Sequence, residues 1–134
     1  MRISRLSLFM IAALGLVGAA VTPASANPKC KPTVTATNSK GIAIKVLRFK
    51  YKIGTATVYS EGLTNKTLSP GEKETWPSQT LGSASNGVVV SSTAVEYQDD
   101  TSGTGSNWGP TKTSEWFPHT FVCGPSHSYN QTVR

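Results

Sequence analysis

Apolar and polar residues alternate in short runs along most of the chain after residue 27. In the segment 33–38, for example, Val34 and Ala36 alternate with threonines. A period of two is typical of a strand with one buried face, and no stretch of ten or more residues has the spacing of an amphipathic helix. The pattern predicts strands at 33–38, 42–53, 56–60, 72–76, 88–98, 112–123 and 128–133.

About seven strands in a domain of this size predict an all-β fold. We expect a small immunoglobulin-like antiparallel β-sandwich, with a small β-barrel as the alternative. Segments rich in Gly, Pro, Asn and Ser separate the strands, among them the Pro-Gly turn of "LSPGE" at 68–72. Neither an internal repeat nor a linker divides residues 27–134, which predicts one domain.

The segment 41–55 changes its apolar parity part-way along. The apolar positions are first even and then odd: Ile42, Ile44 and Val46, then Phe49, Tyr51 and Ile53. One extra residue in a β-bulge, at Leu47 or Arg48, would direct all six inward. It would also place four basic residues together on the opposite face: Lys45, Arg48, Lys50 and Lys52.

The N-terminus predicts a cleaved signal peptide over residues 1–26. Arg2 and Arg5 precede an apolar run at 6–21, and Ala24 and Ala26 occupy the small-residue positions of a cleavage site. A membrane anchor is the alternative, but the run is short for a spanning helix. We therefore expect a secreted or periplasmic protein.

Two cysteines remain after this cleavage, Cys30 near the new N-terminus and Cys123 near the C-terminus. In an oxidising compartment they predict a disulfide bond. Closing so long a loop stabilises a fold by about 4–5 kcal/mol in the chain-entropy model. The alternative is a nucleophilic or metal-binding thiol.

Charge favours an anionic partner but not nucleic acid. Loss of two arginines with the signal peptide lowers the formal net charge from +6 to +4, which is well below the positive charge density of a dedicated nucleic-acid binder. The row of Lys45, Arg48, Lys50 and Lys52 is the main candidate binding surface. Its alternative role is to keep a solvated strand from aggregating.

Tryptophan adds a second candidate, because its large amphipathic ring is favoured in recognition surfaces. Trp108 stands next to Gly109 and Pro110 in a long loop, and we expect it to be partly exposed. Trp76 or Trp116 should lie inside.

Metal binding and catalysis have weaker support. Asp99, Asp100 and Asn107, with nearby serines, offer oxygen ligands for calcium, although a hairpin loop uses the same residues for turns. His119, Cys123 and His127 share a parity, but a Gly-Pro pair breaks the strand between the last two. A Gly-x-Ser-x-Gly nucleophile motif is missing from the sequence. We expect no catalytic residue, no cofactor and no transition-metal site.

The sequence therefore predicts an exported, non-enzymatic binding module. Its ligand would be a surface glycan, an anionic polymer or a protein partner on a cell surface. The alternatives are a membrane-active, toxin-like protein that contacts a membrane surface, and a small secreted hydrolase.

Overall fold

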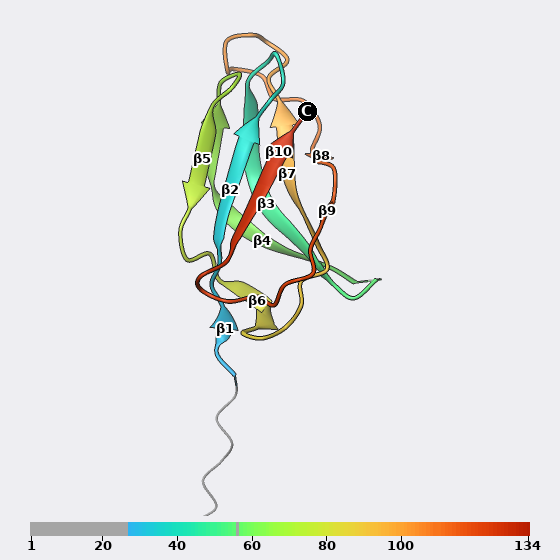
Figure 1. Cartoon of the computed structure of the whole chain (residues 1–134). Coiled ribbons are helices and arrows are strands. Elements are labelled where there is room, and N and C mark those ends of the chain that lie inside the picture. Colours follow the sequence, from blue (N-terminus) through green and yellow to red (C-terminus); the bar gives the residue numbers. More distant parts are fainter. Residues whose placement is uncertain (1–26, 56) are drawn as a thin grey trace, which may run out of the picture.

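The computed structural model describes residues 27–55 and 57–134, and the predicted signal peptide lies outside them. Every regular element in these residues is a β-strand. Figure 1 shows two layers of strands, with β2, β5 and β10 in front of β3 and β4. The prediction of an all-β sandwich is confirmed. The described strands form open sheets and do not close into the alternative barrel.

The smaller layer has three strands in the order β10-β2-β5. Its central strand β2 (Thr33–Asn38) runs antiparallel to β5 (Lys73–Trp76) and parallel to β10 (Ser128–Val133). The parallel pairing brings the first and last parts of the described chain together. The Pro-Gly turn leads into β5, and Gly71 has the positive φ of 82° that such a turn requires.

The larger layer has five strands. Its order is β4-β3-β7-β8, with β9 also paired to β7. The strands are β3 (Ile44–Ile53), β4 (Thr57–Leu68), β7 (Ser92–Asp99), β8 (Lys112–Thr113) and β9 (Phe117–Pro118). All of these pairings are antiparallel, so the sheet can bury one face and leave the other to solvent.

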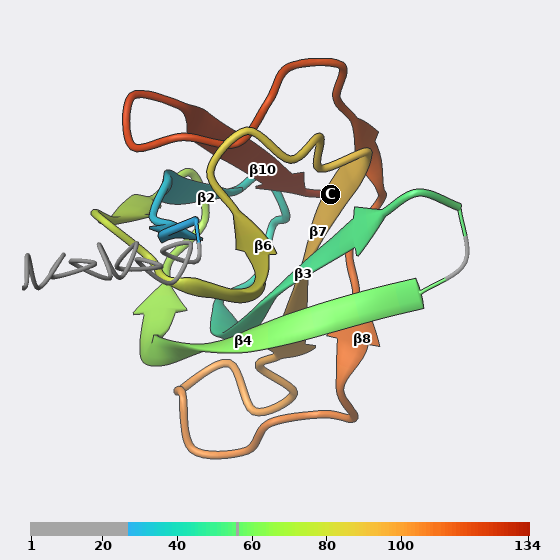
Figure 2. The same ribbon diagram turned by 90° about the horizontal axis from the view of Figure 1, so that it is seen from below.

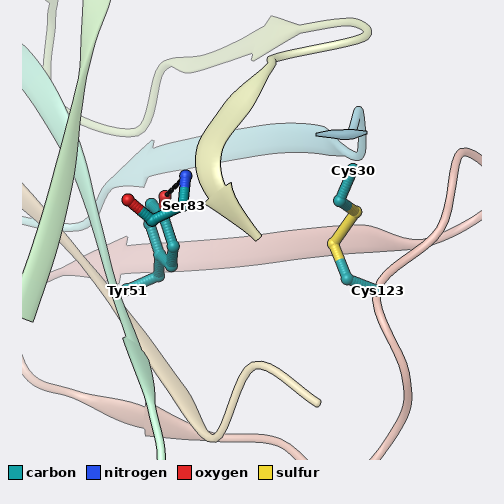
Figure 3. The surroundings of a disulfide bond; sticks show 4 residues. All are labelled: Cys30, Tyr51, Ser83 and Cys123. Atoms are coloured by element: carbon teal, nitrogen blue, oxygen red, sulfur yellow. Dashed lines mark hydrogen bonds between the residues drawn. A yellow bond between two sulfur atoms is a disulfide. The ribbon is translucent and has the colours of Figure 1, made fainter. Parts of the chain in front are cut away.

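A short ribbon of β1 (Lys29–Cys30) and β6 (Leu81–Ser85) lies at one end of the sandwich, as Figures 1 and 2 show. The disulfide between Cys30 and Cys123 joins β1 to the segment before β10, which confirms the predicted bond (Figure 3). On the core side, the Tyr51 hydroxyl accepts a hydrogen bond of 3.0 Å from the Ser83 amide of β6. Covalent and polar contacts thus attach this ribbon to the sandwich.

The core fills the space between the two sheets. Its largest fully buried side chains are Tyr51, Tyr129, Phe49, Ile44, Leu68 and Leu81. They come from both layers and from β6, and a contact chain of aromatic rings runs from Tyr59 through Tyr51 and Phe49 to Tyr129. Burial of each such side chain stabilises the fold by about 1.5–3 kcal/mol.

The predicted bulge in β3 is confirmed. Val46 pairs with Tyr97 of β7 and Arg48 pairs with Glu96, so Leu47 has no counterpart on β7. On the other side of β3, the register with β4 also shifts between Val46 and Arg48.

Ile42 is a correction to the predicted core. It precedes β3, and its side chain is 43% exposed. The side-chain amide of Asn38 donates a hydrogen bond of 2.9 Å to the Ile42 carbonyl, so this residue belongs to the turn that leads into the strand. Ile53 packs against the core but is only half-buried.

Several predicted strand limits were also wrong. The strand predicted at 56–60 is the beginning of β4, which continues to Leu68, while residue 56 lies outside the described part. The strand predicted at 88–98 begins only at Ser92, with Val89 held in an isolated bridge to Val122. β6 was not predicted.

The strand predicted at 112–123 is divided into β8 and β9. The Ser114 hydroxyl, rather than a backbone carbonyl, accepts the hydrogen bond from the Val95 amide at 3.0 Å. A side chain thus takes the place of the backbone in the ladder, and the regular strand ends there.

Candidate functional site

Strand β3 places its four basic side chains on the outer face of the larger sheet. The inward positions Ile44, Val46, Phe49 and Tyr51 are fully buried. Successive side chains of a strand point to opposite faces, and the bulge at Leu47 brings the two halves of the row onto one face. We call the outward residues the basic row: Lys45, Arg48, Lys50 and Lys52.

Two tryptophans contact the two ends of the basic row. The Lys45 ammonium lies 4.4 Å from the centre of the Trp108 ring, and the Lys52 ammonium lies 4.3 Å from the centre of the Trp116 ring. Both distances are in the range of a cation–π interaction. Both tryptophans are half-buried, so each indole supports a lysine and still presents surface to solvent.

Trp108 has a fixed backbone although it belongs to a long loop. It forms an isolated β-bridge with Asp100. The next residue, Gly109, donates a backbone hydrogen bond of 2.8 Å to Asp99 and accepts one of 3.0 Å from the Gln98 side chain. The end of β7 therefore holds the loop on both sides of this indole.

Trp116 is anchored in a similar way on the other part of β7. Two residues before it, Ser114 both donates a backbone hydrogen bond to Val95 and accepts one from it. Directly after it, β9 pairs with the beginning of β7. β7 thus holds the backbone segments that carry both indoles, and β3 lies on the other side of β7.

The middle of the basic row is held by polar neighbours. Lys50 lies 3.1 Å from the Glu96 carboxylate and donates a hydrogen bond of 2.9 Å to the Thr113 hydroxyl. Arg48 donates through Nε to the Ser60 hydroxyl at 2.6 Å. Among the described residues, Glu96 is the one carboxylate that forms an ion pair with the row, so the face keeps an excess of positive charge.

Asp99, the first of the predicted calcium ligands, forms ion pairs with two lysines. Its carboxylate lies 2.7 Å from the Lys112 ammonium and 2.8 Å from the Lys40 ammonium. Burial alone would raise the pKa of Asp99, but the hydrogen bonds from Lys112 and Lys40 outweigh it and lower the pKa. These ammonium groups occupy the place that a cation would need.

Asp100 and Asn107 organise the loop. The Asp100 carboxylate accepts hydrogen bonds from the Ser102 hydroxyl at 2.6 Å, the Ser102 amide at 3.0 Å and the Gly105 amide at 2.8 Å. The Ser102 hydroxyl is the largest cause of the lowered pKa of Asp100. The Asn107 carbonyl accepts a hydrogen bond from the Thr101 amide. This arrangement matches the turn-forming alternative, and the described residues contain no group of three or more His, Cys, Asp and Glu side chains suited to a metal.

The histidines do not come together with a thiol. His119 places Nε2 2.7 Å from the Thr93 hydroxyl, and burial lowers the pKa of His119. The His127 ring stacks on Phe121 at 4.8 Å between ring centres. Cys123 is in the disulfide, so the alternative of a reactive or metal-binding thiol was wrong.

Sequence reasoning placed Trp108 correctly at the surface and missed Trp116. The prediction that Trp76 or Trp116 lies inside is confirmed by Trp76, which is buried and donates through its indole N–H to the Thr64 carbonyl at 3.1 Å. The position of Trp116 beside Lys52 has no local sequence signal, because Trp116 follows Lys52 by 64 positions, just as Trp108 follows Lys45 by 63.

Comparisons with protein-family models, with curated proteins and with solved structures find no match. Within residues 27–55 and 57–134, no helix has the length and apolar character needed to span a membrane.

Proposed function

We propose that the protein is an exported, non-enzymatic binding module whose basic row binds an anionic polymer at a cell surface. The observation that carries the proposal is the alignment of Lys45, Arg48, Lys50 and Lys52 on one sheet face, with Glu96 as their single carboxylate partner among the described residues. The disulfide between two buried cysteines is compatible with an oxidising, extracellular location.

The spacing of the row suits a polymer better than a small anion. Alternate residues on one strand face are about 7 Å apart, because each residue advances a strand by about 3.3 Å. The cations therefore form a line rather than a cluster that converges on one point. A linear chain with repeated negative charges can meet each of them in turn.

The row is partly preorganised for such a ligand. Lys45 and Lys52 rest on indole rings, and Lys50 is held by Glu96 and Thr113. Side chains that are already ordered lose less conformational entropy when a ligand binds. These contacts also favour recognition over the alternative role of the lysines as a purely solvated strand face.

The experiment compares two variants with equal changes of net charge. The first replaces Lys45, Arg48, Lys50 and Lys52 with Gln. The second replaces four exposed lysines that do not belong to the row with Gln, namely Lys29, Lys31, Lys66 and Lys73. Affinity for polygalacturonate and for polyphosphate is measured by calorimetry at several salt concentrations.

We expect the wild-type domain to bind at least one of these polymers, with an affinity that falls as salt rises. Loss of four surface ion pairs should weaken binding by about 30-fold and flatten the salt dependence. The control variant should retain most of the affinity. Equal losses in the two variants would assign binding to net charge alone, and the basic row would then not be the site.

A further inference from the structure

The two tryptophans add an aromatic surface to each end of the basic row. We infer that the anionic polymer is an acidic polysaccharide, with sugar rings stacking on Trp108 and Trp116 while its anionic groups pair with the lysines and Arg48. This inference rests on the proposed function and deepens it, because it names the class of polymer.

Each indole is paired with a cation that can act on the same sugar unit. The Lys45 and Lys52 ammonium groups lie 4.4 Å and 4.3 Å from their ring centres. Each ammonium lies over its indole ring, so a sugar that packs its C–H face on the remaining exposed part of the indole would bring a carboxylate or sulfate beside the ammonium. Polyphosphate can use the ammonium groups but has no apolar face to place on an indole.

Both indoles are supported as rigid platforms. Backbone hydrogen bonds at Gly109 hold one side of Trp108, and its β-bridge to Asp100 holds the other. Trp116 lies between Ser114 and β9, both of which bond to β7. A half-buried tryptophan with a fixed backbone presents a large contact area at a small entropic cost.

The distance between the platforms requires a chain of several sugar units. Lys45 and Lys52 lie at the two ends of β3, and six regular steps of about 3.3 Å, with one residue taken up by the bulge, separate them by about 20 Å. A single sugar or a lipid headgroup cannot contact both indoles. An oligosaccharide can, and the second contact then forms at a high effective concentration.

Hydroxyl groups between the platforms fit the same ligand. Ser60 and Thr113 lie beside Arg48 and Lys50 and already accept hydrogen bonds from them. Their hydroxyl protons remain available to donate to a ligand. A polysaccharide offers hydroxyl and ring oxygens along its length as acceptors.

The test uses oligogalacturonides of increasing length and, separately, polyphosphate. Affinities are measured for the wild-type domain, for Trp108→Ala and for Trp116→Ala. The variants Trp108→Phe and Trp116→Phe, which keep an aromatic face, are included together with the thermal unfolding midpoint of each protein, so that a folding defect is recognised.

For the wild-type domain, affinity should rise with oligosaccharide length until both indoles are reached, and then level off. Each alanine variant should bind the longest oligosaccharide about tenfold more weakly and lose the gain with length. Binding to polyphosphate should stay within about twofold, and the phenylalanine variants should recover most of the affinity for the oligosaccharide.

Three results would overturn the inference and leave the proposed function in place. The first is full affinity for the oligosaccharide in the folded alanine variants. The second is an equal loss of affinity for the oligosaccharide and for polyphosphate in these variants. The third is a wild-type domain that binds polyphosphate but not oligogalacturonide. If the wild-type domain binds neither polymer, the proposed function itself is wrong. If only an alanine variant fails to fold, the phenylalanine variant decides, and loss of oligosaccharide binding in a folded phenylalanine variant also contradicts the inference.

Discussion

The His119 ring belongs to a buried polar chain that crosses the two sheets. The Gln131 side-chain amide of β10 donates to the Thr93 hydroxyl of β7, and Thr93 lies 2.7 Å from His119 Nε2. Thr93 and Gln131 are both fully buried. Since Thr93 accepts from Gln131, its own proton is directed to His119, which makes Nε2 the acceptor of a neutral imidazole.

This chain predicts a loss of stability in mild acid. Burial holds the pKa of folded His119 below its ordinary value near 6.5, so the unfolded chain binds more protons as the pH falls through that value. The free energy of unfolding should therefore decrease between pH 7.5 and pH 5.5. Urea unfolding of the wild type and of His119→Gln, which keeps an acceptor but does not titrate, measures the effect.

The wild type should lose more stability than His119→Gln across this interval. The neighbouring ring of Tyr129 does not contribute, because burial raises the pKa of Tyr129 to about 12 and keeps it neutral. Equal losses in the two proteins would assign the pH dependence to other groups.

Among the elements, β3 contributes side chains both to the core and to the basic row, and the extra residue Leu47 makes both contributions possible. Without an extra residue, the side chains on one half of the strand would exchange faces. Either Phe49 and Tyr51 or Ile44 and Val46 would then point to solvent.

Deletion of Leu47 tests this role. Each exposed apolar side chain costs about 1.5–3 kcal/mol, so the deletion should lower the free energy of unfolding by several kcal/mol and abolish cooperative melting. Leu47→Ala keeps the register and should have a small effect, because Leu47 is not in the core. Thermal unfolding followed by circular dichroism compares the two variants. A deletion variant that melts like Leu47→Ala would show that the register does not depend on this residue.

The elements also show what the sequence could predict. The β3 bulge was predictable because six apolar residues change parity within one strand. β6 was not, since Leu81 and Ala84 are its buried positions and do not alternate. Glu61 and Tyr51 of the larger sheet hold this strand through the amides of Gly82 and Ser83, and such long-range contacts have no local signal.

At the scale of the whole molecule, the candidate site is assembled from distant parts of the chain. Its cations all lie on the single strand β3, and this half was predictable from the sequence. Its aromatic half comes from the segments on either side of β8, which reach β3 only because both pair with β7. The lysine–tryptophan contacts therefore depend on the completed sheet and could not be predicted.

The β1-β6 ribbon lies at the end of the sandwich where the described chain begins (Figure 1), and the disulfide at Cys30 of β1 belongs to the same end. They stabilise the frame without entering the basic row. This separation allows the charges of the row to be changed while the stabilising elements stay intact.

The most direct measurement of the central claim is a map of amide and indole NMR shifts of residues 27–134 during titration with an oligogalacturonide long enough to span β3. We predict that the changes concentrate on the backbone amides of 45–52 and on the indole N–H signals of Trp108 and Trp116. The indole signal of buried Trp76 should stay constant and serves as the internal control. Changes confined to β2, β5 and β10 would contradict the account, because they would place the ligand on the opposite sheet.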